Sequence, residues 1–236
     1  MKLAEVEDTM WYFMALHKRM LIPLTHWRGQ KAEVLDAGCG TGGLIRTLEQ
    51  YEPLWSLTGL DFSPVACSMA RERTNARIFQ GSVTDMPFAN ESFDIVLSAD
   101  MISEVEDPGK ALSEFARVLK PGGVIVINVS AYRWLWSYHD DAVNTQHRFR
   151  RRELIRMLRS CKLESFQASY ANMFILPLII ARRKLFPPKV LASDVKQYSP
   201  IIDQLCSLLA SGEHAWIRHK QSLPTGCSVF IAARKA

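Results

Sequence analysis

The chain has 236 residues, of which 48% are hydrophobic and 22% are charged. These proportions are typical of a globular protein and exclude a disordered or collagen-like chain. The longest apolar run, residues 173–181, contains Pro177 and is far too short to cross a membrane. The N-terminus is too acidic for a secretory signal, so the sequence predicts a cytoplasmic protein without a membrane span.

Charge is unevenly divided along the chain. Residues 1–120 carry 12 Lys and Arg against 17 Asp and Glu, whereas residues 121–236 carry 17 against 7. Seven of the basic side chains lie between Arg148 and Lys162, where Glu153 is the only acid. A basic half attracts anionic substrates, nucleic acid or a membrane surface, but a solvated helix face is the simpler interpretation for most of these residues.

The five cysteines are far apart and form no C-x-x-C pair. This spacing argues against a disulfide framework and against structural zinc, so we expect free thiols and no metal site. The cysteines are Cys39, Cys67, Cys161, Cys206 and Cys227.

The hydrophobic pattern begins as a helix over residues 1–28 and then alternates between short apolar runs and helical stretches. This alternation predicts βαβ units and a parallel sheet covered on both faces. The predicted strands are residues 34–35, 56–60, 77–79, 95–97 and 124–129, and the predicted helices are 43–51, 64–75, 108–119 and 151–160. Residues 120–123, Lys-Pro-Gly-Gly, predict a sharp turn into the fifth strand.

Two further strands are predicted at residues 163–169 and 228–233. The stretch between them, from Tyr170 to about Lys220, is less regular, with Pro187-Pro188 in its middle and apolar segments on either side. Because it is longer than an ordinary connection, it predicts an inserted cap of about 50 residues. The expected organisation is a helical lid (1–32), a core (33–170), the cap (171–222) and a last core strand (223–236).

The first predicted strand ends in a glycine-rich turn, Val-Leu-Asp-Ala-Gly-Cys-Gly-Thr-Gly-Gly at residues 34–43. Glycines at such a turn let the backbone approach a ligand and expose N–H groups. Gly38, Gly40 and Gly43 also satisfy the G-x-G-x-x-G dinucleotide fingerprint. Asp36 argues against that interpretation, because its carboxylate would repel a pyrophosphate and suits a cationic ligand or an ammonium group.

Polar residues also follow the second and third predicted strands. Asp61 closes the second strand, where its two oxygens can accept both hydroxyls of a ribose, although alone it also fits a helix cap before Ser63. Ser82 and Val83 follow the third strand, in a loop placed to flank an adenine ring. Because the carboxyl ends of parallel strands converge, these segments predict one ligand site.

These residues resemble the class I S-adenosylmethionine-dependent methyltransferases. The resemblance rests on residues 34–42, 59–63, 86–94 and 117–123, and its core covers about 30–170. It implies an α/β fold with a Rossmann-like, seven-stranded, mostly parallel sheet and helices on both faces. It also implies S-adenosylmethionine as the cofactor.

The resemblance assigns roles to individual residues. Asp36 and the backbone of residues 38–42 hold the methionine end, Asp61 binds the ribose, Phe62 lies against the adenine, and Ser82 with the Val83 N–H reads the adenine edge. The predicted cofactor-binding residues are Asp36, Ala37, Gly38, Cys39, Gly40, Gly42, Asp61, Phe62, Ser82, Val83 and Ser98. The chain departs from the family at Ser82, where Asp is common, and at residues 102–104, where a Leu-Glu-His stretch is replaced by Ile-Ser-Glu.

Methyl transfer to a hydroxyl or a protonated amine also requires loss of a proton, for which imidazole is a natural base. His139 follows the fifth strand, on the side of the sheet toward which the methyl group would point, and is the predicted catalytic residue. A loop histidine that bonds a backbone carbonyl is the alternative, and His147 and Asp100 are further candidates. Nearby aromatic residues either line the acceptor site or anchor the cap: Trp134, Trp136 and Tyr138.

The sequence therefore predicts methyl transfer to an oxygen or nitrogen atom of a small molecule, of natural-product or glycan type, by a monomer or homodimer. Methylation of RNA or protein is a second hypothesis, suggested by the basic segment. No nucleic-acid-binding module or stacking pattern accompanies those charges, which argues against nucleic acid. A third hypothesis is a cofactor-binding partner subunit without turnover, and a fourth, weaker one is a membrane-surface protein that uses residues 182–184.

Overall fold

The computed structural model describes residues 4, 6–187, 193–219 and 222–236. Its strands are β1 (Ala32–Ala37), β2 (Trp55–Asp61), β3 (Arg77–Gln80), β4 (Phe93–Ala99), β5 (Leu119–Ser130), β6 (Leu163–Ala171) and β7 (Ser228–Lys235). They form one sheet in the order β3-β2-β1-β4-β5-β7-β6, in which β7 runs antiparallel to β5 and β6 and the other pairs are parallel. The predicted seven-stranded, mostly parallel sheet is confirmed.

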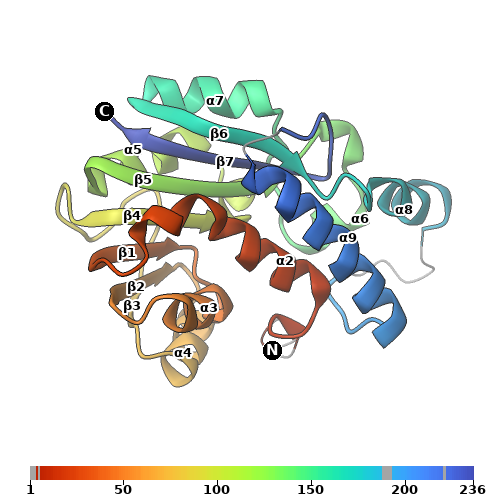
Figure 1. Ribbon diagram of the computed structural model, residues 1–236, viewed down its shortest axis with the longest axis horizontal. Coiled ribbons are helices and arrows are strands. Elements are labelled where there is room, and N and C mark those ends of the chain that lie inside the picture. The colour runs from red at the N-terminus through yellow and green to blue at the C-terminus, as the bar shows by residue number, and fades with distance from the viewer. Residues whose placement is uncertain (1–3, 5, 188–192, 220–221) are drawn as a thin grey trace.

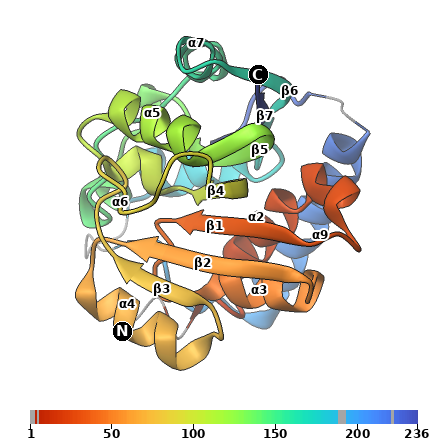
Figure 2. The ribbon, with the colours of Figure 1, turned by 90° about the vertical axis from the view of Figure 1, so that its left-hand side faces the viewer.

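Helices cover both faces of this sheet, with α5 on one side and α2 and α9 on the other (Figures 1 and 2). The α-helices are α2 (Trp11–Met20), α3 (Gly43–Tyr51), α4 (Pro64–Arg73), α5 (Pro108–Val118), α6 (Tyr138–Ala142), α7 (Arg151–Ser160), α8 (Leu176–Ile180) and α9 (Pro200–Arg218). Shorter helical turns are Ile22–Trp27, Met101–Glu104, Arg133–Leu135 and Ala181–Leu185.

The central strands are apolar because both of their faces are covered. Ile95, Val96 and Leu97 of β4 are each 0% exposed, as expected for a parallel strand between two helical layers. The helix α5 shows the complementary pattern, since one face carries Leu112 and Phe115 into the core. Its start is fixed by the side chain of Asp107, which accepts a hydrogen bond from the Lys110 N–H at 2.9 Å.

Two sequence expectations differ from the structure. Residues 120–123, predicted as a turn, lie within β5, where Gly122 takes a φ of +76° and the pairing with β4 shifts register. The stretch from Tyr170 to Lys220, predicted to be less regular, contains α8 and the long helix α9, whose buried residues Cys206, Ala210 and Ile217 recur at helical spacing. Within this predicted cap, residues 188–192 and 220–221 lie outside the described residues.

The N-terminal helix and the cap pack on each other. Figure 1 shows α2 beside α9, and α2 also contacts β4 and β5. A small apolar cluster joins Met10 and Trp11 to Ile175 and Cys206. Among the described residues, no helix is both long and apolar enough to span a membrane.

Candidate active site

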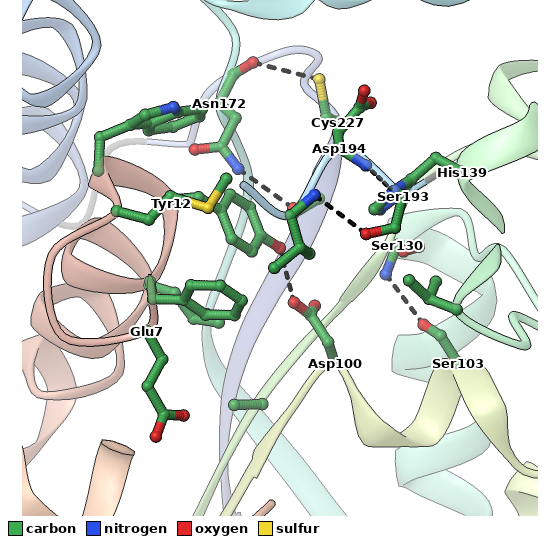
Figure 3. A pocket seen from close by; sticks show the side chains of 18 of the residues that line it. Glu7, Tyr12, Asp100, Ser103, Ser130, His139, Asn172, Ser193, Asp194 and Cys227 are labelled. Carbon is green, nitrogen blue, oxygen red and sulfur yellow. Dashed lines mark hydrogen bonds between the residues drawn. The ribbon is translucent and has the colours of Figure 1, made fainter. Parts of the chain in front are cut away.

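A cavity of about 850 Å³ lies at the carboxyl ends of β1, β2, β4 and β5. Figure 3 shows the part of its lining around Tyr12, Asp100 and His139. The glycine-rich turn and Asp61 form one end, and α2 and the cap close over it. Ligand sites usually fall between about 300 and 1,000 Å³, so this cavity has room for a cofactor and a small second molecule.

The glycine-rich turn is built at the end of β1. Gly38, Gly40 and Gly42 take φ angles of +84°, +53° and +89°, in the left-handed region that favours glycine. A Cβ at Gly38 would lie 2.3 Å from Cγ of Met101, so a larger residue would displace the turn after β4. The turn therefore depends on glycine for its conformation and for its packing.

Asp61 braces the glycine-rich turn. Its Oδ2 accepts a hydrogen bond from the Gly40 N–H at 2.8 Å, and its Oδ1 accepts one from the Ser63 N–H at 2.9 Å. Each carboxylate oxygen retains a second lone pair for a ligand. The cap of α4 is provided by Ser63, whose Oγ accepts from the Ala66 N–H, so the helix-cap interpretation of Asp61 is not needed.

Asp36 is a buried carboxyl group without a partner. It is 2% exposed, and neither oxygen makes a hydrogen bond within the described residues. Burial, together with the negative charges of Asp61 and Glu7, raises its pKa to about 8. A bound cation would supply the missing interaction and favour the ionised form, so this environment fits the positively charged end of S-adenosylmethionine.

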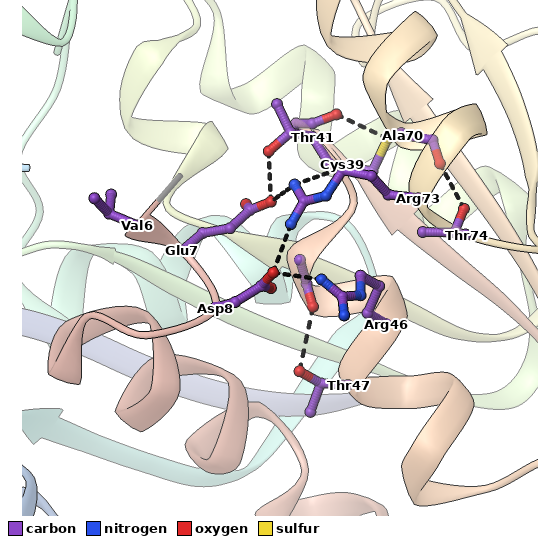
Figure 4. Close-up of polar contacts among 12 residues, drawn as sticks. Val6, Glu7, Asp8, Cys39, Thr41, Arg46, Thr47, Ala70, Arg73 and Thr74 are labelled. Carbon is purple, nitrogen blue, oxygen red and sulfur yellow. Dashed lines mark hydrogen bonds and ion pairs between the residues drawn. The ribbon is translucent and has the colours of Figure 1, made fainter. Parts of the chain in front are cut away.

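The segment before α2 is fixed over the glycine-rich turn by ion pairs (Figure 4). Glu7 is 5% exposed, and its Oε1 accepts from the Thr41 hydroxyl at 2.6 Å and from Arg73. Asp8 accepts from Nη2 of Arg73 at 2.8 Å. A Cβ at Gly43 would lie 2.7 Å from Glu7, so the N-terminal segment lies directly against this turn.

A second polar network surrounds Asp100, at the end of β4. Asp100 accepts hydrogen bonds from the Tyr12 hydroxyl and from Nδ2 of Asn128, both at 2.6 Å. Asn128 in turn accepts from Nη2 of the buried Arg19 at 3.1 Å. Burial raises the pKa of Asp100, and its φ of +65° is unusual for a residue other than glycine. The network ties α2 to the middle of the cavity.

His139 lines the far end of the cavity. Its Nδ1 lies 3.0 Å from the backbone N–H of Asp194, which donates to it from the cap (Figure 3). Burial and the nearby positive charge of Arg183 lower its pKa to about 4. The ring is therefore neutral at physiological pH.

The helix that carries His139 is held by a buried ion pair. Asp140 is 0% exposed and receives Nε and Nη2 of Arg148 at 2.7 and 3.1 Å. Its Oδ2 also accepts from the Ser137 N–H at 2.8 Å, which closes the first turn of α6. Arg148 is thus structural, whereas Arg152 and Arg156 of the basic segment lie exposed on α7.

The structure gathers part of the predicted site around the cavity. The predicted residues that line it are Asp36, Gly38, Cys39, Gly40, Asp61 and His139. The predicted residues outside its lining, within the described chain, are Ala37, Gly42, Phe62, Ser82, Val83 and Ser98. Phe62 is 79% exposed beside the carboxyl end of β2, and the Oγ of Ser82 lies 2.8 Å from that of Thr84.

The aromatic residues after β5 are not in the cavity lining found among the described residues. Trp134 is 52% exposed, Trp136 donates its indole N–H to Asp141, and Tyr138 donates its hydroxyl to Asp194. The last contact supports the interpretation of these residues as anchors for the cap. Nε2 of His147 lies 3.1 Å from the Glu106 carbonyl oxygen, as expected for a structural histidine.

Sequence reasoning missed Glu7 and Asp194, which line the cavity, and Asn128, which donates a hydrogen bond to Asp100 in its lining. The signal for Asn128 was present, because it interrupts the apolar run Val-Ile-Val-Ile-Asn-Val in a strand buried on both faces. Glu7 and Asp194 have no comparable signal, since their contacts join segments far apart in the sequence.

Part of the chain is similar to known proteins. Residues 35–127 match a family model described as methyltransferase domain. The chain is 36% identical over 114 residues to a demethylmenaquinone methyltransferase of Staphylococcus aureus, a match that covers 46% of each protein. The likeness thus spans about half the length of this curated relative.

Solved structures agree in fold over nearly the whole chain. One is a sarcosine dimethylglycine methyltransferase, described as putative, from Galdieria sulphuraria, with a TM-score of 0.64, 18% identity and coverage of 95% of this chain and 86% of that one. Another is a geranyl diphosphate C-methyltransferase from Streptomyces coelicolor, with a TM-score of 0.64, 16% identity and coverage of 95% and 81%. The latter was crystallised with S-adenosyl-L-homocysteine. At these identities the likeness shows the fold alone.

Proposed function

Because residues 35–127 match a family model described as methyltransferase domain, we propose that this chain is a class I enzyme that transfers a methyl group from S-adenosylmethionine to an oxygen or nitrogen atom of a small molecule. One observation carries the proposal. Asp36, whose carboxyl makes no hydrogen bond within the described residues, and the catalytic candidate His139 line the same cavity, at its cofactor end and beneath the cap respectively.

At the cofactor end, Asp36 and the backbone of Ala37, Gly38, Cys39, Gly40 and Gly42 hold the methionine portion. Asp61 accepts hydrogen bonds from the ribose, for which its remaining lone pairs are available. Phe62 lies against the adenine, consistent with its exposure beside β2, and Ser82 with the Val83 N–H reads the adenine edge. Ser98 completes the proposed set from within β4.

At the acceptor end, His139 contacts the molecule to be methylated. The surrounding wall is largely aliphatic, which suits an acceptor with an apolar body: Leu135, Val143, Ile175, Leu178, Ile179 and Ile202. The named relative takes its name from demethylmenaquinone and the S. coelicolor neighbour from geranyl diphosphate, two small molecules with an apolar isoprenoid chain, which supports a natural-product acceptor over a glycan.

When bound, S-adenosylmethionine supplies a methyl group on a positively charged sulfur that is open to in-line attack. The chain's own residues align the acceptor and exclude water, which lowers such a barrier by roughly 7–11 kcal/mol. Glu7, Tyr12 and Trp11 contribute by closing α2 over the cavity. We further propose a cytoplasmic monomer or homodimer that does not act on nucleic acid.

A methyl-transfer assay tests the function. The purified chain is incubated with methyl-labelled S-adenosylmethionine and a panel of apolar hydroxyl- and amine-bearing compounds, and labelled product is measured. We expect transfer to at least one member, and a rate about 10²–10³-fold lower with His139→Leu. Transfer to bulk RNA or protein, with none to the panel, would contradict the proposal.

A further inference from the structure

We propose that His139 serves the reaction as a hydrogen-bond donor to an oxygen atom of the acceptor, and not as the base that removes its proton. The inference rests on the proposed function, because it concerns the acceptor end of the same site. It also narrows the substrate class to molecules that present a hydroxyl, phenolate or carbonyl oxygen beside the methylated atom.

The hydrogen bond at Nδ1 determines the tautomer of His139. The partner of this nitrogen is a backbone N–H, that of Asp194, and a backbone N–H can only donate. Nδ1 must therefore carry a lone pair, and a neutral imidazole with a free Nδ1 has its proton on Nε2. A ring fixed in this tautomer offers N–H, and not a lone pair, from Nε2.

The cap holds His139 in this state. Asp194 is fixed by its carboxylate, which accepts from Nε of Arg183 at 2.8 Å and from the Tyr138 hydroxyl at 2.8 Å. Its carbonyl oxygen accepts from the Tyr198 hydroxyl at 3.0 Å. The N–H that faces Nδ1 therefore comes from a backbone anchored on both sides.

Burial keeps the ring neutral, because it lowers the pKa of His139 more than any neighbouring charge does. Arg183 and Arg148 lower this pKa further, whereas Asp194 and Asp140 raise it without reversing the shift. The two carboxylates are themselves engaged, Asp194 with Arg183 and Asp140 with Arg148. Nε2 makes no hydrogen bond within the described residues, so its N–H is available to a ligand in the cavity.

The proton of the acceptor then leaves by another route. Transfer forms a bond between the acceptor atom and the methyl carbon, breaks the carbon–sulfur bond and leaves the sulfur neutral, so the acceptor must release one proton. Glu104 lines the same cavity, and burial with the charges of Asp100 and Asp61 raises its pKa to about 7. A carboxylate with that pKa accepts the proton efficiently near neutral pH.

Nuclear magnetic resonance of the ¹⁵N-labelled protein saturated with S-adenosyl-L-homocysteine tests the tautomer without any acceptor. The His139 signals are those that disappear in His139→Gln. We expect a protonated Nε2 and an unprotonated Nδ1 that stay unchanged from pH 5.5 to 8. A proton on Nδ1, or titration of the ring near pH 6.5, would overturn the inference.

Substitution tests the role once the acceptor assay has yielded a substrate. Glutamine keeps an amide N–H donor but cannot act as a base at neutral pH, so the activity of His139→Gln should stay within about 10-fold of wild type. Leucine has no donor, so His139→Leu should lose about 10²–10³-fold in activity, as when an oxyanion donor is removed. Equal losses in both variants would instead indicate a base. His147→Gln, outside the described cavity lining, is the matched control and should keep full activity.

The two proposals fail in different ways. A chain that binds no S-adenosyl-L-homocysteine, or transfers no methyl group, contradicts the proposed function. A chain that does both, but carries its proton on Nδ1 of His139, contradicts only this inference.

Discussion

The two ends of the cavity are built in contrasting ways. At the cofactor end, Asp36 and the glycine-rich turn come from one strand–turn–helix unit, and Asp61 comes from the neighbouring strand. At the acceptor end, His139 depends on Asp194 and Arg183, which are more than forty residues away and belong to the cap. Local motifs define the first end, whereas the second exists only once distant segments have packed.

The two ends of the cavity also differ in the charged residues that line them. Asp36, Asp61 and Glu7 surround the cofactor end, in the acidic half of the chain. Arg148, Arg182 and Arg183 lie at the acceptor end, in the basic half. A cationic cofactor and an acceptor that presents a negatively polarised oxygen are the ligands that match this polarity.

The largest effect is expected from Arg148→Ala, which disrupts the acceptor end alone. Removing one partner leaves the fully buried Asp140 uncompensated, and such a loss costs about 3–5 kcal/mol of unfolding free energy. Denaturant unfolding measures it. At denaturant concentrations below the unfolding transition, the variant should keep its affinity for S-adenosyl-L-homocysteine. If the variant lost both stability and this affinity, the two ends of the cavity would not be independent.

Asp61→Ala is expected to affect the cofactor end. It removes charge-assisted contacts, and we expect affinity for S-adenosyl-L-homocysteine to fall by about 1.5–3 kcal/mol. Titration calorimetry provides the measurement. Asp141→Ala is the control, because Asp141 lies exposed on α6. If this variant lost as much affinity for S-adenosyl-L-homocysteine as Asp61→Ala, the ribose-binding role of Asp61 would be contradicted.

Asp36→Asn should change the dependence of stability on pH. The pKa of Asp36 is about 8 in the folded protein and near 3.8 when unfolded, so between these values the folded state holds a proton that the unfolded state has lost. Wild-type stability should therefore fall relative to the variant by about 1.4 kcal/mol per pH unit as pH rises through this window. Unfolding curves at pH 6 and 7 give the slope, and parallel pH profiles would contradict the buried, partnerless state of Asp36.

The smallest effect is expected from the basic face of α7. Arg152 and Arg156 are exposed, so Arg152→Ala combined with Arg156→Ala should change the unfolding free energy by less than about 0.5 kcal/mol. Methyl transfer to a small acceptor should be unchanged. A large loss of activity, with strong sensitivity to salt, would point to a polyanionic substrate.

The same contrast explains what the sequence could predict. The bounds of α3 and α7 agree with the predicted helices 43–51 and 151–160, because periodicity and adjacent turns mark them locally. The position of Asp61 beside the glycine-rich turn follows from parallel strand order. The partner of His139 did not follow, because Asp194 lies in a connection whose path is determined by packing against α2 and α6, and no local pattern encodes such a contact.

The central claim is that the cofactor end binds S-adenosylmethionine and not a dinucleotide. Calorimetric titration of the purified chain with S-adenosyl-L-homocysteine, with NAD as the comparison ligand, tests it most directly. We expect micromolar binding of the first and none of the second, because an ammonium group favours the ionised form of Asp36, whereas a pyrophosphate brings no cation to this buried carboxyl. Binding of NAD, or no binding of S-adenosyl-L-homocysteine, would contradict the account.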